Sequence, residues 1–401
     1  MNGVALSPLT EKAEVVRGVT FSKGDAVAEP REGYTPVLRA GNIQSHLILD
    51  SDLVYIPEEM VSEKQRLRRG DIVMCTSSGS AEIVGKTAFA DQDWIGSFGA
   101  FCAVVRPKLG KCHPRYLFHY LQTPRFREWT RNSSGVGIKN IRKSELDSYE
   151  VPFPSLDEQR RIAATLDKAD AIRRKRKQAL TMADDFLRSV FLEMFGDPAS
   201  NSRGWPITLL DELGDVQGGL QVSSKREAGV LTLPYLRVAN VYRDRLELAE
   251  IKEINLTEAE FRRVRLQVGD ILIVEGHGNP EEIGRSAIWD GSIEPCVHQN
   301  HLIRFRADRS RALPEYISRL LNSDGGRQQL IGAGRTTSGL NTISTRKVKE
   351  VRIPLPPVTL QQKFSEVVKA RLSTTEKLLT QLELSRSLIS SLSHRAFRGE
   401  L

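Results

Sequence analysis

The chain contains an internal repeat, and this repeat constrains its architecture more than any other feature. The segment Leu38–Ile43 recurs as Leu236–Val241, an offset of 236 − 38 = 198 residues. The segment Arg69–Val73 recurs at nearly the same spacing as Val268–Leu272. Similar segments in the same order predict two copies of one structural unit.

Further matches extend the repeat toward the end of each copy. A length of 401 residues accommodates two units, because a single hydrophobic core usually stops growing at about 250–300 residues. We therefore expect two similar domains. The further pairs are Ile83–Lys86 with Glu282–Arg285, Gly137–Ile141 with Gly339–Ile343, and Val151–Pro154 with Ile353–Pro356.

Each copy has a globular part, a proline-rich junction and a long helical segment. Gly-Asp pairs at Gly70–Asp71 and Gly269–Asp270 precede β-branched runs, and we interpret them as structural turns, since glycine tolerates positive φ and aspartate caps turns. Short β-branched runs predict strands in the globular parts. These runs are Ile72–Cys75, Phe101–Arg106, Ile271–Val274 and Leu302–Phe305.

Two segments show alternating steps of three and four residues, which is the heptad seam of a long coiled-coil helix. Prolines precede both segments and favour a helix start there. Two such helices most economically bury their seams as an antiparallel pair; two unrelated core helices or separate homodimer zippers are the alternatives. The seam positions are Ile162, Leu166, Ala169, Arg173, Arg176, Leu180, Ala183, Leu187, Val190 and Met194, and then Phe364, Val368, Arg371, Thr375, Leu378, Leu382, Ser385, Ile389, Leu392 and Ala396.

Polar residues interrupt both seams. They include Arg173 and Arg176 in the first segment and Arg371, Thr375 and Ser385 in the second. Polar seam residues cost stability but can fix register and pairing.

These patterns predict an α+β fold in four parts. Two similar globular domains would span residues 1–155 and 199–357. The two long antiparallel coiled-coil helices would occupy residues 156–198 and 358–401, giving a pseudo-two-fold internal repeat.

Basic residues exceed acidic ones by 58 to 50, which gives a net charge of +8 and a pI near 9.3. This balance suits a polyanionic partner without requiring one. The N-terminus has no apolar leader, and no stretch is long and apolar enough to span a membrane. We expect a cytoplasmic protein.

The four cysteines form no CxxC pair, so we expect reduced, mostly buried thiols. Cys112 and His113 could be half of a metal site, but nothing nearby completes it. The glycine-rich stretch Glu275–Pro280 lacks the pattern of a phosphate-binding loop, and a loop near DNA is the better interpretation. No motif for adenine methylation or ATP hydrolysis is present, so we expect no catalytic residues, no metal and no cofactor in this chain.

The junctions carry a resemblance to a known family. Val151–Ile162 resembles the signature that opens the conserved helical regions of type I restriction-modification specificity subunits, and Ile353–Phe364 is its partner. The Gly-Asp-Ile turns, the run Val297–Leu302 and the segment Phe191–Pro198 extend the resemblance over nearly the whole chain. It implies that each globular part is a target recognition domain and that the helices form an antiparallel spacer with an approximate two-fold relation.

The resemblance also implies a function. The chain would be a non-catalytic subunit that recognises a bipartite, asymmetric target in double-stranded DNA. It would direct methyltransferase (modification) subunits and restriction endonuclease and translocase subunits to that target. S-adenosylmethionine, ATP and magnesium would then be cofactors of the assembly, and none would be bound by this chain. A stiff spacer would fix the number of unread base pairs between the half-sites.

Two positions depart from the family pattern. The second copy has Leu213–Val216 after its Gly-Trp-Pro start, whereas the first has Val16–Val19 in that position. Leu360 stands where the first copy has the more usual Glu158.

Candidate DNA contacts lie on glycine-rich loops that could approach a DNA backbone closely. Lys139 and Asn140 follow such a loop in the first copy, and Arg335, Thr336 and Asn341 belong to the matching loop of the second. The same residues could be turns before a strand.

Four more basic residues are candidates. Lys86 and Arg285 end a repeated motif, and Arg173 and Arg174 open the basic run 173–177. That run could contact spacer phosphates or a partner subunit, or it could be a solvated helix face.

Arg39 and Asn42 recur as Arg237 and Asn240. Residues that read different bases should differ between the copies, so we interpret this pair as structural.

Three other functions fit less well. A stand-alone bipartite DNA-binding protein would use the same fold without enzyme partners. A coiled-coil scaffold without a DNA role and an unrecognised enzyme are the remaining alternatives.

Overall fold

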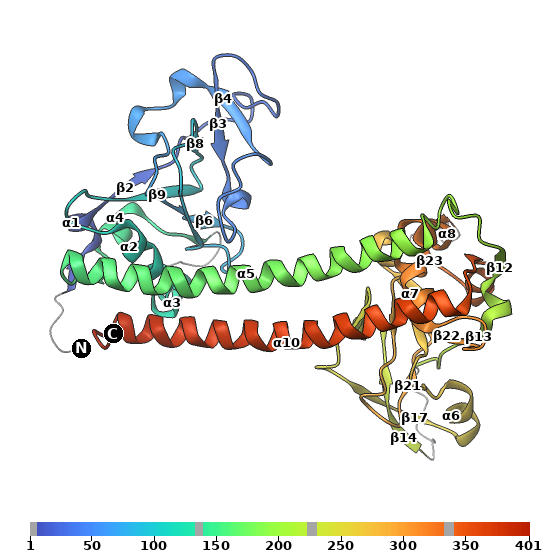
Figure 1. Ribbon diagram of the computed structural model, residues 1–401. Coiled ribbons are helices and arrows are strands. Elements are labelled where there is room, and N and C mark those ends of the chain that lie inside the picture. Colours follow the sequence, from blue (N-terminus) through green and yellow to red (C-terminus); the bar gives the residue numbers. More distant parts are fainter. Residues whose placement is uncertain (1–5, 133–138, 223–230, 333–340) are drawn as a thin grey trace. The chain divides into compact units, whose positions relative to one another are not determined.

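The computed structural model describes residues 6–132, 139–222, 231–332 and 341–401, which form two compact units. Unit 1 contains Met1–Gln178 and Leu379–Leu401, and unit 2 contains Ala179–Leu378. The two long helices, α5 (Leu156–Phe195) and α10 (Val358–Ala396), each contribute residues to both units (Figure 1).

Unit 1 contains a mixed globular part in which a four-stranded sheet, in the order β2-β9-β5-β7, adjoins a three-stranded sheet, in the order β4-β3-β8. Its strands are β1 (Leu6–Pro8), β2 (Ala13–Arg17), β3 (Tyr34–Leu38), β4 (Val54–Pro57), β5 (Ile72–Cys75), β6 (Ser77–Ser78), β7 (Thr87–Phe89), β8 (Ser97–Phe98), β9 (Cys102–Pro107), β10 (Lys139–Asn140) and β11 (Glu150–Pro152). Its shorter helices are α1 (Leu9–Lys12), α2 (Pro114–Tyr120), α3 (Pro124–Asn132) and α4 (Lys143–Ser148).

Unit 2 repeats this plan, with a four-stranded sheet in the order β13-β22-β18-β20 and a three-stranded sheet in the order β17-β14-β21. Its strands are β12 (Ile207–Leu209), β13 (Gly214–Gly218), β14 (Leu231–Leu236), β15 (Val241–Tyr242), β16 (Arg245–Leu246), β17 (Lys252–Leu256), β18 (Ile271–Val274), β19 (Gly276–His277), β20 (Ser286–Ile288), β21 (Val297–His298), β22 (Leu302–Ala307), β23 (Asn341–Thr342) and β24 (Arg352–Pro354). Its shorter helices are α6 (Glu258–Val264), α7 (Pro314–Asn322), α8 (Asp324–Gly332) and α9 (Thr345–Lys349).

The predicted central strands are confirmed, and their sequences explain their burial. Every residue of β5 and β18 is buried. In β5, Ile72 and Met74 pack into one hydrophobic cluster and Val73 and Cys75 into another. Because successive side chains of a strand point to opposite faces, a continuous apolar run is required when both faces are covered.

The start of the first copy differs from the sequence-based alignment. Strand β2 pairs with β9 so that Ala13 opposes Pro107, and β13 pairs with β22 so that Gly214 opposes Ala307. The segment equivalent to Leu213–Val216 is therefore Lys12–Val15, and the assignment of Val16–Val19 to this position was wrong. Strand pairing sets the actual register of this segment, and a local sequence comparison does not reveal it.

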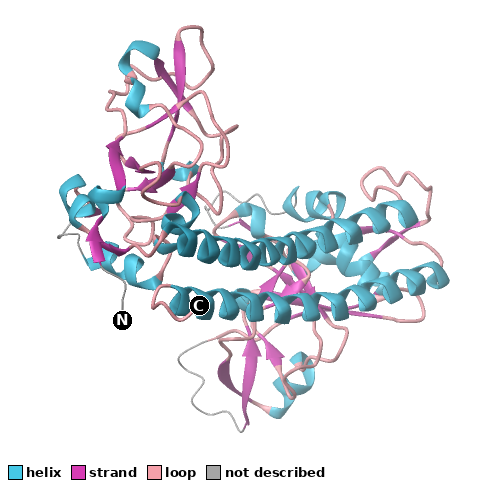
Figure 2. Cartoon of the chain, turned by 60° about the vertical axis from the view of Figure 1, so that its left-hand side comes forward, coloured by secondary structure: helices cyan, strands magenta, loops and turns pink. Residues whose placement is uncertain are grey.

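In unit 1, the beginning of α5 packs against the end of α10, so the helices are antiparallel there (Figure 2). Ile162 and Leu166 form a buried cluster with Ala396 and the partly buried Leu392. The Arg176 guanidinium donates to the Gln381 carbonyl oxygen at 2.7 Å and also bonds the Ser385 hydroxyl. These polar seam residues thus join the two helices at one register.

In unit 2, the end of α5 packs against the beginning of α10, again in antiparallel orientation. Phe191 and Phe195 lie against Phe364, with ring centroids 5.4 Å apart in both pairs. Arg371 forms an ion pair with Asp184 across the helices. All predicted seam positions of both helices are buried or partly buried, which confirms the heptad assignment and the antiparallel pair.

The same side chains attach the globular part to the long helix in both units. Gln159 accepts a hydrogen bond from the His113 amide at 2.8 Å and donates to the Pro154 carbonyl at 2.8 Å. Gln361 likewise accepts from the Leu313 amide at 2.8 Å. The glutamine of the junction motif is therefore a structural anchor.

Replacing Gln361 with Leu is expected to reduce the free energy of unfolding by about 1–3 kcal/mol, because buried backbone groups lose their partners. Gln361 also donates to the carbonyl oxygens of Pro356 and Arg311. Denaturant unfolding of the variant measures this loss. The neighbouring Gln362 is exposed, and Gln362→Leu should change stability far less; equal losses in both variants would contradict the anchor role.

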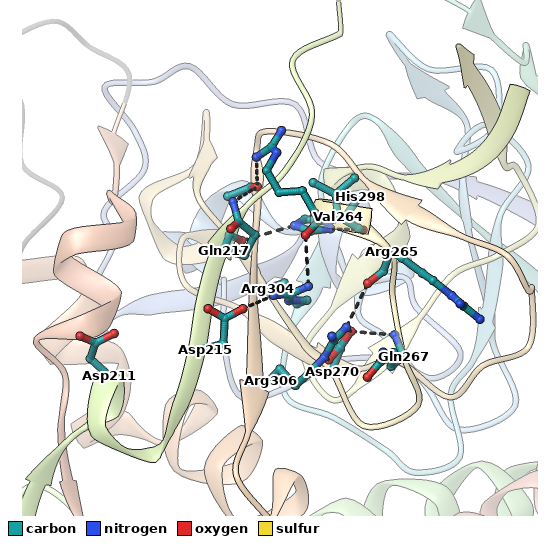
Figure 3. Close-up of polar contacts among 12 residues, drawn as sticks. Asp211, Asp215, Gln217, Val264, Arg265, Gln267, Asp270, His298, Arg304 and Arg306 are labelled. Carbon is teal, nitrogen blue, oxygen red and sulfur yellow. Dashed lines mark hydrogen bonds and ion pairs between the residues drawn. The ribbon is translucent and has the colours of Figure 1, made fainter. Parts of the chain in front are cut away.

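Buried charged groups stabilise the sheet of unit 2 (Figure 3). Asp270 is almost completely buried and accepts two hydrogen bonds from Arg306, both at 2.7 Å. It also accepts from the Gln267 amide at 2.7 Å, which holds the turn before β18. Arg304 pairs with Asp215 on β13. The Gly-Asp turns are thus structural, as predicted.

His298 on β21 is fully buried, and its ring nitrogens face backbone carbonyl oxygens, Nδ1 toward Val264 at 3.1 Å and Nε2 toward Gln217 at 3.4 Å (Figure 3). Burial, together with the nearby Arg304 charge, lowers the pKa of His298 to about 4. The equivalent residue of unit 1 is Phe98, which is also buried.

This difference predicts that unit 2 is sensitive to acid. The folded state keeps His298 neutral, whereas the unfolded state binds a proton below pH 6.5. The contribution of His298 to the free energy of unfolding is therefore fully present above pH 6.5. It falls by up to about 3 kcal/mol as the pH decreases from 6.5 to about 4. Unfolding measured at several pH values should show this slope. His298→Phe should flatten it, and an unchanged slope in that variant would assign the effect to other groups.

Candidate nucleic-acid interface

A two-stranded ribbon places the predicted loop residues of unit 1. Strand β10 pairs with β6 in antiparallel register, with Lys139 opposite Ser78 and Asn140 opposite Ser77. The Ile141 amide donates to the Thr76 carbonyl oxygen at 2.8 Å and continues this pairing. Lys139 and Asn140 are therefore strand residues that directly follow the glycine-rich segment.

Unit 2 forms the same ribbon from different residues. Strand β23 pairs with β19, with Thr342 opposite Gly276 and Asn341 opposite His277. The Ile343 amide donates to the Glu275 carbonyl oxygen at 2.8 Å. The predicted contacts Arg335 and Thr336 lie outside the described residues.

Lys86 and Arg285 have different surroundings. The Lys86 ammonium donates to the Gln44 side chain at 2.8 Å, and its side chain is partly exposed. Arg285 is only 5% exposed, pairs with Glu282 at 2.6 Å and lies 4.7 Å from the centre of the Tyr242 ring. This placement favours a structural role for Arg285, and its contact with DNA stays a prediction.

The first two residues of the basic run of α5 are engaged with their own helix. Arg173 and Arg174 both form ion pairs with Asp170, at 2.7 and 3.3 Å. Arg174 is nevertheless 44% exposed, whereas Arg173 is 28% exposed. Arg174 is thus the more accessible of the two for a phosphate or a partner subunit.

The recurring Arg-Asn motif is structural, as predicted. Asn42 is completely buried, and its side-chain amide donates to the carbonyl oxygens of Ile48 and Ser51. Asn240 donates in the same way to Glu247 and Glu250. These bonds close the loop after β3 and after β14.

Sequence reasoning assigned no role to Phe101 or His301, which flank the ribbons, although it placed the stretch Glu275–Pro280 near DNA. Phe101 is 67% exposed, and its carbonyl oxygen accepts from the amides of Thr76 and Ser77. The equivalent residue of unit 2 is His301, whose carbonyl oxygen accepts from the Glu275 amide at 3.0 Å. The sequence signal that could have identified these residues is the difference between Phe101 and His301 at equivalent positions of the two copies.

The described residues contain no group of three or more His, Cys, Asp and Glu side chains that could hold a metal ion. The four cysteines are free and buried, and burial raises the pKa of Cys112 to about 12. No helix in the described part of the chain is long and apolar enough to cross a membrane.

Comparisons with known proteins identify a family to which the chain is similar. A family model, the type I restriction modification DNA specificity domain, matches residues 1–182. The chain is 30% identical over 421 residues to the type I restriction enzyme EcoKI specificity subunit of Escherichia coli (strain K12), covering 100% of this chain and 89% of that protein. It is also 30% identical over 418 residues to the StySPI specificity subunit of Salmonella potsdam, with the same coverage.

Solved structures share the fold. The S subunit of a type I restriction-modification system from M. genitalium aligns with a TM-score of 0.57 at 14% identity, covering 99% of this chain and 97% of that one. A chain from a structure on the assembly and conformational transition of the type I system aligns with a TM-score of 0.57 at 17% identity, covering 100% and 99%.

Proposed function

The chain belongs to the family of type I restriction-modification specificity subunits, and from this premise we propose that it recognises a bipartite, asymmetric DNA target. It directs the methyltransferase and endonuclease subunits of the complex to that target. The chain itself is a non-catalytic subunit.

One observation supports DNA recognition by both units of the chain. The ribbon beside the glycine-rich segment forms in both units with the same register, yet its flanking residues differ. Two equivalent frames with different exposed side chains are what two unlike half-sites require, since base identity is read by side-chain contacts to base edges.

Each of the four parts of the chain has a proposed role. Residues 1–155 and 199–357 are the two target recognition domains, and residues 156–198 and 358–401 form the spacer. The partners are double-stranded DNA, the modification subunits and the restriction subunits, and the proposed location is the cytoplasm. The proposed DNA contacts are Lys86, Lys139, Asn140, Arg285, Arg335, Thr336 and Asn341 in the recognition domains, with Arg173 and Arg174 on the spacer.

The test begins with co-expression of this chain and candidate modification subunits. A stable complex that prefers one duplex sequence over others supports the proposed function. An isolated chain that remains monomeric and sequence-specific, with no affinity for modification subunits, would instead identify a stand-alone DNA-binding protein.

Replacing Lys139 with Ala is expected to weaken binding of the complex about equally for all duplex sequences, because a lysine that contacts phosphate carries no base information. The slope of log affinity against log salt should become shallower by about 0.9 for one lost phosphate contact. Fluorescence anisotropy at several salt concentrations measures both quantities.

Lys111 provides a matched control. It is exposed and follows the end of β9 that is remote from the ribbon, so Lys111→Ala should leave the slope unchanged. A Lys139→Ala effect confined to one base position would show that this lysine reads a base instead.

A further inference from the structure

The two ribbons share one backbone frame down to individual hydrogen bonds. In unit 1 the Thr76 amide donates to the Phe101 carbonyl oxygen at 2.9 Å. In unit 2 the Glu275 amide donates to the His301 carbonyl oxygen at 3.0 Å. These pairs of residues therefore occupy equivalent positions beside the proposed DNA contacts.

The side chains at these positions differ in chemistry. The Thr76 side chain is buried, and its hydroxyl donates to the Phe101 carbonyl oxygen at 3.2 Å. The prominent feature of unit 1 at this place is thus the Phe101 ring, which is largely exposed. A large, exposed apolar ring beside the proposed DNA contacts suits the methyl group of thymine.

Unit 2 presents an acid and an imidazole instead. The Glu275 carboxylate lies 3.7 Å from His301 Nδ1, with the two side chains 27% and 53% exposed. Partial burial raises the pKa of Glu275, against the opposing effect of His301. A further hydrogen-bond donor stabilises the charged form of a half-buried carboxylate. The exocyclic amino group of cytosine is such a donor in the major groove.

Residues that hold the fold do not change in this way between the units. Residues that hold the fold recur, including the Asp-Arg pairs Asp71–Arg106 and Asp270–Arg306. Arg127 and Arg327 also recur, and each donates to the backbone of the turn that follows the ribbon strand. Within a shared backbone frame, the positions of Phe101 and of Glu275 with His301 are among those where the exposed chemistry changes.

We propose that Phe101 and the Glu275–His301 pair are base-reading residues, the first at a thymine of one half-site and the second at a base with a major-groove amino group in the other. This assignment rests on the proposed function. Each residue then determines one position of one half-site and leaves the other half-site unaffected.

The experiment uses the complex of this chain with its modification subunits and a library of duplexes randomised at each position of the wild-type target. Phe101→Ala is expected to lower discrimination about tenfold at one position of one half-site. Glu275→Gln is expected to change the preferred base at one position of the other half-site. Leu109→Ala and Glu315→Gln are the matched controls, because both residues lie beyond the remote ends of β9 and β22.

Each outcome decides between the possibilities. Unchanged preferences in both variants would overturn the assignment while leaving the proposed function intact. Equal loss of binding to every duplex by an assembled complex would also overturn it, because a base-reading residue affects one position. Absence of a split target for the wild-type complex would reject the proposed function itself. In every variant, unchanged recognition of the other half-site shows that the complex is folded.

Discussion

Inserting one heptad into each long helix is expected to abolish recognition of the original target and to create a target with a longer spacer. Seven helical residues add about 10 Å, which corresponds to about three base pairs at roughly 3.4 Å per pair. The insertions belong between Gln178 and Ala179 and between Leu378 and Leu379, where the chain passes from one unit to the other. A whole heptad keeps the seam in phase on both helices.

The measurement is binding or methylation by the complex on duplexes that keep both half-sites and vary the spacer. Insertion of two residues in each helix is the control, since it turns the seam by about 200°, away from the contact face, and should disrupt the helix pair. Altered half-site preference with an unchanged spacer would contradict the role of the helices as a ruler.

Replacing Asp270 with Ala is expected to destabilise unit 2 by about 3–5 kcal/mol, because the change leaves a partly buried guanidinium without its partner. Arg306 loses both of its 2.7 Å bonds to the carboxylate, and the Gln267 amide loses its acceptor. Unit 1 contains the same arrangement in Asp71 and Arg106.

Calorimetry of the full chain distinguishes the two units, because only the transition of unit 2 should move in Asp270→Ala. Asp52→Ala is the matched control. Asp52 pairs with Arg39 at the surface, with side chains 62% and 48% exposed, and exposed pairs contribute at most about 1 kcal/mol. Similar losses in the two variants would contradict the structural importance of the buried pair.

The long helices were the most predictable part of the fold. Their heptad seam is a local pattern, so a side chain such as Leu166 or Leu382 can be assigned to the buried face from spacing alone. The central strands β5 and β18 were predictable for a similar reason, since a short β-branched run after a Gly-Asp turn combines two local signals.

Features that depend on distant segments were not predictable. The start of the first domain was misaligned because the register of β2 is set by pairing with β9, far along the chain. Asp71 could be assigned to a turn, but its partner Arg106 lies on another strand. Likewise, spacing alone does not show that Phe101 is exposed while Arg285 is buried.

Sequencing of genomic DNA for newly methylated adenines, after co-expression of this chain with its modification subunits, tests the central claim most directly. The account predicts a split motif of two short, different half-sites that disappears when this chain is omitted. A stable complex that methylates one continuous motif, or the same motif without this chain, would contradict it.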